Sequence, residues 1–308
     1  MATRGKRVAV LMGGFSAERE VSLVSGTAVA RALRERGHDV IDIDVGPNVA
    51  FALAEAQPEV VFNALHGRFG EDGCIQGMLE MMGLPYTHSG VLASALAMDK
   101  PAARVMFADA GIRIPEGRIA HRDEVTAGSV MEPPYVVKPA NEGSSVGVVL
   151  VFEHDDNPFA DGSWMYRDNH VLVERYVPGR ELAAAVMGSE TLGVVEIKVS
   201  GNGFYDYDAK YRPGGSLHQM PARIPQAAYD ACMKIAQTAH GRLGCRGVTR
   251  VDLRYDEAQG EVDGLYLLEI NTQPGMTPTS LVPEIAGHRG VSFGELVEWM
   301  VEDAGCRR

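Results

Sequence analysis

The most informative part of the sequence is Tyr266–Thr277, which reads YLLEINTQPGMT. Side chains alternate between the two faces of a strand, so Glu269 and Asn271 are expected on one face. Upstream, the run TRVDL places Arg250 and Asp252 on one face in the same way. If the two strands pair, their carboxylates and amide form a set of oxygen ligands that suits Mg²⁺ bound to phosphates better than Zn²⁺. The alternative is an edge pair whose polar side chains face solvent.

Length and composition limit the classes of protein that the chain can represent. Its 308 residues suffice for two or three compact units, and 45% hydrophobic residues supply a sizeable core. The net charge of −12 and the lack of a Lys/Arg block argue against nucleic-acid binding, so an anionic substrate would need locally concentrated cations. The four cysteines form no CxxC, which indicates reduced thiols in a cytosolic protein. No signal peptide or membrane span is expected, because no apolar run approaches about 18 residues.

The N-terminal part of the chain predicts an α/β unit. Val8–Met12 is typical of a central parallel strand, and Ser16 is expected to cap a helix that continues to Gly37, before a second strand at Val40–Val45. This βαβ pattern lacks GxGxxG, so no dinucleotide site is predicted. Glu18 follows the first strand at the sheet edge where such folds bind ligands, although it could simply complement the helix dipole.

A second candidate residue follows the next buried strand, Val60–Leu65. His66 begins the polar loop HGRFGEDG, which leads into a helix at Ile75–Met82. The position of His66 at the carboxyl end of a strand favours ligand binding, whereas loop histidines more often cap or pack. We expect a short strand at Leu84–Thr87 and place the end of this unit near Met98.

A glycine- and serine-rich loop in the middle of the chain indicates phosphate binding. The strand Tyr135–Pro139 carries Lys138 and is followed by the run NEGSSVG and a further strand. The loop joins two strands and the chain lacks GxxxxGK[ST], so this is not a P-loop. Glycines and serines nevertheless let main-chain N–H groups and hydroxyls approach phosphate oxygens. An ordinary hairpin turn remains the alternative.

The C-terminal part combines an antiparallel strand pair with two amphipathic helices. The strands are expected at Glu181–Met187 and Thr191–Lys198, and the helices at Ala227–Leu243 and Phe293–Asp303. Between them, Arg212–Pro221 is a polar Gly/Pro loop of the kind that closes over a site as a lid.

Six segments carry a combined pattern that is more specific than any one of them: GFSAEREVS (14–22), LHGRFGEDG (65–73), MDK (98–100), EGSSVG (142–147), YDYDAKY (205–211) and LEINTQPGMTPTSL (268–281). Together they resemble the D-alanine–D-alanine ligase family of the ATP-grasp superfamily over nearly the whole chain. The resemblance implies an α/β and α+β fold, with a Rossmann-like N-terminal substrate domain (1–98) and a two-lobed ATP-grasp unit. The central lobe (99–180) would hold the phosphate loop, and the C-terminal lobe (181–308) the metal site and the lid loop.

The resemblance also implies roles for individual residues. Nucleotide binding falls to Lys100, Lys138 and Lys210 on the phosphates, Ser145 above them, Glu174, Tyr176 and Val177 at adenine, and Glu181 at the ribose. Two Mg²⁺ ions, replaceable by Mn²⁺, would be bound by Asp252, Glu269 and Asn271. Substrate contacts and catalysis fall to Glu18 and His66 at the first D-alanine, a hydrogen-bonded Glu18–Ser144–Tyr211 set, an oxyanion hole of Arg250 and the Gly275 amide, and Ser280 with the Leu281 amide at the second carboxylate.

The implied activity is ATP-dependent ligation of two D-alanines through a D-alanyl phosphate, for peptidoglycan and cell wall synthesis, by a cytoplasmic homodimer. Two positions depart from the family pattern: Gln273 stands where a smaller serine is common, and Tyr176 where Trp is common. One alternative is a related ligase with D-lactate as acceptor, for which Tyr211 is the discriminating residue. The other is a non-catalytic nucleotide-binding module, against which the intact Lys138 and Arg250 argue.

Overall fold

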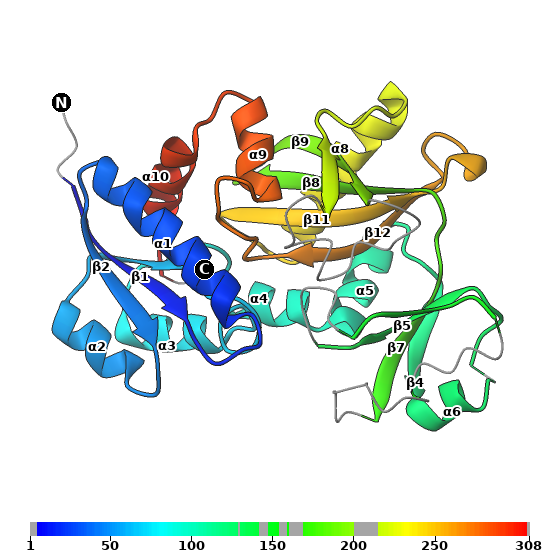
Figure 1. Ribbon diagram of the computed structural model, residues 1–308, viewed down its shortest axis with the longest axis horizontal. Coiled ribbons are helices and arrows are strands. Elements are labelled where there is room, and N and C mark those ends of the chain that lie inside the picture. Colours follow the sequence, from blue (N-terminus) through cyan, green and yellow to red (C-terminus); the bar gives the residue numbers. More distant parts are fainter. Residues whose placement is uncertain are drawn as a thin grey trace.

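The computed structural model describes residues 5–128, 130–141, 147–153, 159, 169–199 and 215–306. Three sheets organise the described chain, one of three strands, one of four and one of five (Figure 1). The first is parallel, whereas every strand pairing in the other two is antiparallel. This combination of α/β and α+β architecture is the predicted fold class. No helix among the described residues is long and apolar enough to cross a membrane.

The N-terminal unit is a short parallel sheet with helices on both sides. Its elements are β1 (Arg7–Gly13), α1 (Arg19–Glu35), β2 (Asp39–Val45), α2 (Val49–Ala56), β3 (Val60–Asn63) and α3 (Cys74–Met82). The strand order is β2-β1-β3, which puts β1 in the centre. Val8, Ala9, Val10 and Leu11 are therefore fully buried, as expected for a strand covered on both faces.

Two local predictions for this unit are wrong. Helix α1 begins at Arg19, and Ser16 does not cap it. The Ser16 hydroxyl instead accepts from the Glu18 amide at 3.1 Å and donates to the His66 carbonyl at 2.7 Å, because it joins two loops at the sheet edge. The expected strand at 84–87 is reduced to isolated bridges from Tyr86 to Val61 and Gly305.

The middle of the chain forms two helices that pack against the five-stranded sheet, followed by the four-stranded sheet. Its elements are α4 (Val91–Met98), α5 (Lys100–Asp109), β4 (Gly117–His121), α6 (Arg122–Thr126), β5 (Tyr135–Pro139), β6 (Val149–Val151) and β7 (His170–Arg175). The order is β4-β7-β5-β6, so β5 and β7 are neighbours. Their pairing sets Lys138 opposite Leu172 and Val136 opposite Glu174, which brings the predicted phosphate strand alongside the predicted adenine position.

The C-terminal unit is the five-stranded sheet with helices on both faces. Its elements are β8 (Arg180–Met187), β9 (Glu190–Val199), β10 (Ser216–Gln219), α8 (Gln226–Arg242), β11 (Val248–Tyr255), the 3-10 turn η1 (Glu257–Gln259), β12 (Leu265–Asn271), α9 (Leu281–His288) and α10 (Phe293–Asp303). The order β10-β9-β8-β11-β12 confirms the predicted β8–β9 pair. Alternation along β8 sends Leu182 and Ala184 toward α8, and Ala183 and Ala185 toward α9.

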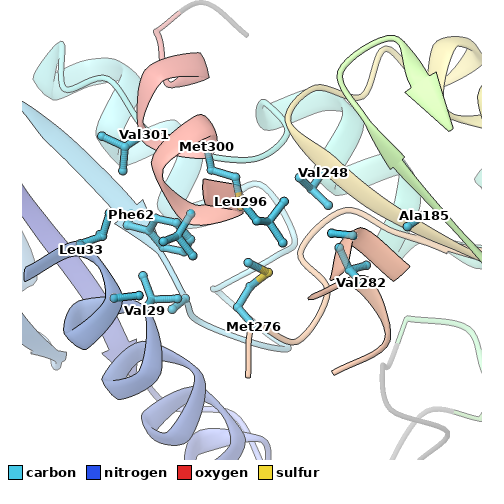
Figure 2. Close-up of a cluster of buried hydrophobic side chains, with 14 of the residues drawn as sticks. Val29, Leu33, Phe62, Ala185, Val248, Met276, Val282, Leu296, Met300 and Val301 are labelled. Carbon is cyan, nitrogen blue, oxygen red and sulfur yellow. The ribbon is translucent and has the colours of Figure 1, made fainter. Parts of the chain in front are cut away.

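A single apolar core connects the first and last parts of the chain. Figure 2 shows Leu33 and Phe62 of the N-terminal unit facing Leu296 and Met300 of α10. The same cluster extends through Met276 to the face of the five-stranded sheet that α9 covers. Helix α10 therefore belongs by sequence to the C-terminal segment but packs against the N-terminal sheet.

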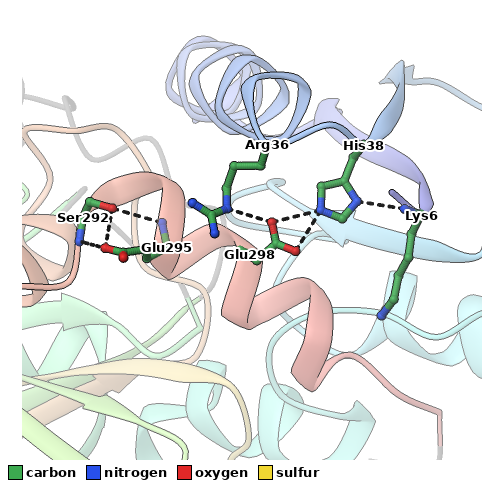
Figure 3. A network of polar contacts seen from close by, with 6 residues as sticks. All are labelled: Lys6, Arg36, His38, Ser292, Glu295 and Glu298. Carbon is green, nitrogen blue, oxygen red and sulfur yellow. Dashed lines mark hydrogen bonds and ion pairs between the residues drawn. The ribbon is translucent and has the colours of Figure 1, made fainter. Parts of the chain in front are cut away.

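Polar contacts reinforce this junction at its edge (Figure 3). Glu298 of α10 accepts hydrogen bonds from Arg36 at 2.8 Å and from His38 at 3.1 Å. The Lys6 ammonium donates to the Val301 carbonyl at 3.2 Å. The N-terminal unit and the five-stranded sheet are thereby held in a fixed relation, and the loops that carry the candidate site residues meet between them.

Candidate active site

The pairing of β11 and β12 confirms the arrangement predicted from alternation. The two strands are antiparallel, with Arg250 opposite Asn271 and Asp252 opposite Glu269. One feature was not predicted, a bulge that leaves Leu268 as an extra residue on β12, between Leu267 and Glu269. A bulge resets alternation, and beyond it Glu269 and Asn271 are half-buried while Ile270 between them is buried.

Cations lie directly beside the carboxylates of this face. Arg250 makes a two-pronged contact with Asp252, in which Nε and Nη2 each donate at 2.7 Å to one carboxylate oxygen. The ammonium of Lys100, at the start of α5, lies 3.4 Å from a Glu269 oxygen. These contacts bring together three predicted site groups from separate elements: the oxyanion arginine, a phosphate lysine and the carboxylates.

The donor set fits the proposed metal ion in its chemistry. Asp252 and Glu269 offer carboxylate oxygens and Asn271 an amide oxygen, all hard ligands of the kind that Mg²⁺ prefers. Among the described residues, no three His, Cys, Asp or Glu side chains are grouped so that they could hold a metal. A metal ion here would therefore depend on the Asn271 amide and on oxygens brought by the nucleotide.

The four-stranded sheet places Lys138 of β5 against Glu174 of β7. The Glu174 side chain is buried, and its carboxylate forms ion pairs with Lys138 and with Arg104 of α5. Arg104 also donates to the Pro115 carbonyl at 2.6 Å. Sequence reasoning missed Arg104, since nothing in its helix marks it as different from a surface arginine. Glu174 orients the lysine predicted to bind phosphate, and its contact with adenine stays a prediction.

A second arginine joins the other predicted nucleotide residues. Arg254 donates to the Val177 carbonyl at 3.0 Å and to Glu181 at 3.3 Å. Its guanidinium also lies 5.6 Å from the centre of the Tyr176 ring. Arg254 therefore organises three positions to which the resemblance gave nucleotide contacts. It lies two residues after Asp252, so its place on the same strand face was the signal that could have identified it.

The N-terminal unit contributes two loops to the candidate site, the loop after β1 and the loop after β3. Glu18 and His66 are both buried, as is Glu71 farther along the second loop. Gly67 has a φ of +67°, and a Cβ there would come within 2.4 Å of a Glu18 oxygen, so this turn requires glycine. The Gly67 amide donates to Glu71 at 2.9 Å. Predicted residues Glu18 and His66 therefore lie together, with Glu71 as a third member that the sequence did not single out.

Burial and neighbouring charges set the protonation of His66 and Glu71. Burial lowers the pKa of His66 to about 4, against a hydrogen bond with the Gln273 main chain, and the charge of Arg250 lowers it further. Burial raises the pKa of Glu71 to about 8, assisted by the negative charge of Glu18. At neutral pH His66 is uncharged and Glu71 is largely protonated. The Gln273 side chain, in the loop after β12, accepts from Asn63 Nδ2 and donates to the Leu65 carbonyl, so the loop that carries His66 lies against the end of β12.

The loop after β12 brings Gly275 against Ser280. A Cβ on Gly275 would lie 3.1 Å from the Ser280 hydroxyl oxygen, so the two predicted residues are adjacent. The Ser280 hydroxyl accepts from the Thr277 amide at 3.1 Å, and Leu281 is the first residue of α9. Main-chain amides at a helix start favour a carboxylate, which agrees with the predicted role of Leu281.

Comparison with known proteins agrees with this geometry. A family model described as D-ala D-ala ligase N-terminus matches residues 7–59 and 50–89, and one described as D-ala D-ala ligase C-terminus matches 113–302. A D-alanine–D-alanine ligase from Cereibacter sphaeroides is 59% identical over 302 residues, 98% of this chain and 97% of its own. The chain belongs to the D-alanine–D-alanine ligase family. A ligase B from Mesorhizobium japonicum is 55% identical over 308 residues, 99% of this chain and 100% of its own.

Solved structures of this ligase family share the fold. The D-alanine–D-alanine ligase of Bacillus anthracis complexed with ATP matches with a TM-score of 0.81 at 26% identity, over 97% of each chain. The VanG D-Ala:D-Ser ligase of Enterococcus faecalis matches with a TM-score of 0.79 at 30% identity, over 97% of this chain and 99% of its own. The predicted two-lobed ATP-grasp architecture is thereby confirmed.

Four predicted site residues lie outside the described residues: Ser144, Ser145, Lys210 and Tyr211. The predicted Glu18–Ser144–Tyr211 set therefore stays a prediction. The lid loop at 212–221 is described only from Gly215 onward, and there the prediction of a loop is wrong in part. Residues 216–219 form β10, which pairs with β9 through main-chain bonds and extends the sheet.

Proposed function

We propose that this chain joins two D-alanines in an ATP-dependent reaction that yields D-alanyl-D-alanine, ADP and phosphate for peptidoglycan precursors. The observation that carries the proposal is the contact, through Gln273, between the loop that carries His66 and the end of β12, beside the face formed by Arg250, Asp252, Glu269 and Asn271. An amino acid bound at this loop would lie next to groups suited to phosphoryl transfer.

The first step activates a carboxylate, which is by itself a poor acylating agent. Transfer of the γ-phosphoryl group to the D-alanine carboxylate gives an acyl phosphate, and the ammonium groups of Lys100 and Lys138 stabilise the charge that develops on the phosphates. Asp252, Glu269 and Asn271 would hold two Mg²⁺ ions, or Mn²⁺ in their place, and these ions would neutralise phosphate charge. Glu174, Tyr176, Val177 and Glu181 would bind the adenosine, with Ser145 and Lys210 over the phosphates.

The second step forms the peptide bond. The amine of a second D-alanine attacks the acyl phosphate carbonyl, and phosphate leaves. Arg250 and the Gly275 amide would stabilise the tetrahedral oxyanion, and each such donor contributes about 3–4 kcal/mol. Ser280 and the Leu281 amide would hold the carboxylate of the incoming D-alanine. Glu18, Ser144 and Tyr211 would fix the closed state, which protects the acyl phosphate from water.

Three broader features complete the proposal. Residues 1–98 would act as the substrate domain, and residues 99–180 and 181–308 as the two ATP-grasp lobes. We place the enzyme in the cytoplasm, where ATP and D-alanine are available, and expect a homodimer. Neither nucleic acid nor a membrane is expected among its partners.

The test is ATP-dependent phosphate release across a panel of amino acids, with every product identified by mass spectrometry. D-Alanine, D-serine and D-lactate are offered as acceptors alongside D-alanine as donor. The proposal predicts D-alanyl-D-alanine as the main product, at one phosphate per dipeptide. ATP binding without turnover would instead favour a nucleotide-binding module. A mixed depsipeptide as main product would favour a D-lactate ligase.

A further inference from the structure

Gln273 connects the two halves of the proposed active site through its side chain. It is 1% exposed and lies in the loop after β12, between the predicted metal ligand and the predicted oxyanion donor. Its Oε1 accepts from Asn63 Nδ2 at 2.8 Å, at the end of β3. Its Nε2 donates to the Leu65 carbonyl and lies 3.4 Å from the Gly70 carbonyl. A side chain of the C-terminal lobe is thereby inserted into the substrate loop of the N-terminal unit.

The main chain of the same residue contacts the predicted metal ligand Asn271. The Gln273 amide donates at 2.7 Å to the Asn271 side-chain oxygen, which orients the amide that the metal site would use. On the other side, the Leu65 carbonyl that accepts from the Gln273 side chain immediately precedes His66, in the loop proposed to bind the first D-alanine. One residue therefore joins a metal-site side chain to the loop that carries a substrate-site side chain.

Buried side-chain amides around Gln273 form one hydrogen-bond network with the loop after β3. Asn63 Nδ2 also donates to the Gly70 carbonyl at 2.9 Å, and Gln76 Nε2 donates to the same oxygen at 2.9 Å. The Leu65 amide donates to the Asn63 side-chain oxygen at 3.2 Å. Gln76 Oε1, by contrast, is a buried atom without a hydrogen-bond partner among the described residues. Removal of the Gln273 side chain from this buried network would leave Asn63 Nδ2 and the Leu65 carbonyl each short of a partner.

We propose that Gln273 is a positioning residue that fixes the loop after β12 against the loop after β3. This inference rests on the proposed function and adds a residue that acts through Asn271 and His66 rather than on substrate. Correct spacing between the two loops would align the acyl phosphate with the attacking amine. Displacement of reacting groups by about 1 Å can cost two orders of magnitude in rate. A gap between the loops would also admit water to the acyl phosphate, which hydrolyses to D-alanine and phosphate.

The experiment compares two variants of Gln273 with a matched control. Gln273→Met keeps the length of the side chain but removes its hydrogen bonds, and Gln273→Glu keeps the shape and the acceptor but removes the donor to Leu65. The control is Gln237→Met, because Gln237 is exposed on α8 and makes one side-chain hydrogen bond, to the Ser189 carbonyl. For each protein, phosphate release, dipeptide formation, the KM for ATP and the folded fraction are measured.

Both Gln273 variants are expected to form dipeptide about tenfold more slowly or worse per folded molecule. Phosphate release should exceed dipeptide formation, to a ratio of about 2 or more, as water competes with the amine. The KM for ATP should stay within about twofold, because the adenosine residues lie on other elements, and the control should match wild type. A protein that was merely less stable would lose rate in proportion to its folded fraction and keep a ratio of 1.

A ratio of 1 in both variants, with rates that follow the folded fraction, would overturn the positioning role. If one variant fails to fold, the ratio of phosphate release to dipeptide formation is taken from the other variant. Absence of dipeptide from the wild-type protein would refute the proposed function itself, so the two failures are distinguishable.

Discussion

Glu71 has the most unusual chemistry of any side chain near the candidate site. It is buried beside Glu18, and the Gly67 amide is its hydrogen-bond donor in the loop. Burial and the neighbouring charge raise its pKa to about 8, so it stays protonated at neutral pH. A protonated carboxyl keeps a second negative charge away from the site proposed for D-alanine. Ionisation of Glu71 therefore opposes folding.

The substitution Glu71→Gln tests this protonation. A group with a raised pKa in the folded state stabilises below its unfolded pKa and loses that contribution as pH rises toward 8. Glutamine is isosteric with the protonated acid and cannot ionise. The melting temperature of the variant minus that of wild type should therefore increase steadily from pH 5 to pH 8.5. A difference that does not change with pH would show that Glu71 titrates normally.

The role proposed for Arg254 follows from the contacts that its guanidinium makes in the structure. It joins Val177, Glu181 and the Tyr176 ring, the positions proposed for adenosine. Arg254→Met should raise the KM for ATP about tenfold, since loss of a charge-assisted hydrogen bond costs about 1.5 kcal/mol. The KM for D-alanine should change little. Arg242→Met is the control, because Arg242 pairs with Asp109 on the surface, and an equal effect there would exclude a local role.

For individual residues, the sequence predicted correctly those whose position follows from the alternation of side chains along a strand. Asp252, Glu269 and Asn271 lie on one face as expected. Arg104 could not be predicted, because its ion pair with Glu174 joins residues 70 positions apart in the chain. Long-range pairs of this kind depend on how the lobes pack, which no local pattern encodes.

Helices and strands with a regular spacing of apolar residues were predicted well. Elements that exist only because they pair with a neighbouring strand were not. Helix α10 begins and ends where its apolar period indicated, at Phe293 and Asp303. Strand β10 was taken for a loop, because its polar residues become a strand only through pairing with β9. The bulge at Leu268 was also missed, since it is defined by the register of β11 against β12.

The start of α10 offers a test of an individual element. Ser292 and Glu295 form a capping box, in which each side chain accepts from the other residue's main-chain amide (Figure 3). Ser292→Ala should lower the free energy of unfolding by about 1 kcal/mol. Thr238→Ala is the control, because the Thr238 hydroxyl lies within α8 and bonds only to the Lys234 carbonyl of its own helix. Equal losses in both variants would show that the box adds nothing to an ordinary hydroxyl contact.

For the molecule as a whole, α10 joins the first and last parts of the chain. Leu296 is fully buried between Phe62 of the parallel sheet and the core under the five-stranded sheet (Figure 2). The sequence predicted the helix but not its location, because an amphipathic period does not identify the surface that it covers. The fixed relation between the units allows the loops after β1, β3 and β12 to form one site.

Leu296→Ala should therefore destabilise the whole protein. Loss of a fully buried leucine costs about 2–5 kcal/mol, and denaturant unfolding should show a lower midpoint for both the N-terminal and the C-terminal unit. Leu92→Ala serves as control, since Leu92 is 68% exposed. If only one unit lost stability, the apolar cluster would not couple them.

The central claim is that the polar face of β11 and β12 performs metal-dependent ligation. The direct measurement is the rate of D-alanyl-D-alanine formation against Mg²⁺ concentration for wild type and Asn271→Ala, with the exposed Asn48→Ala as control. We predict that wild type and control saturate alike with Mg²⁺, whereas Asn271→Ala forms at most about one hundredth as much dipeptide at any Mg²⁺ concentration. A wild-type rate for Asn271→Ala at saturating Mg²⁺ would contradict the account.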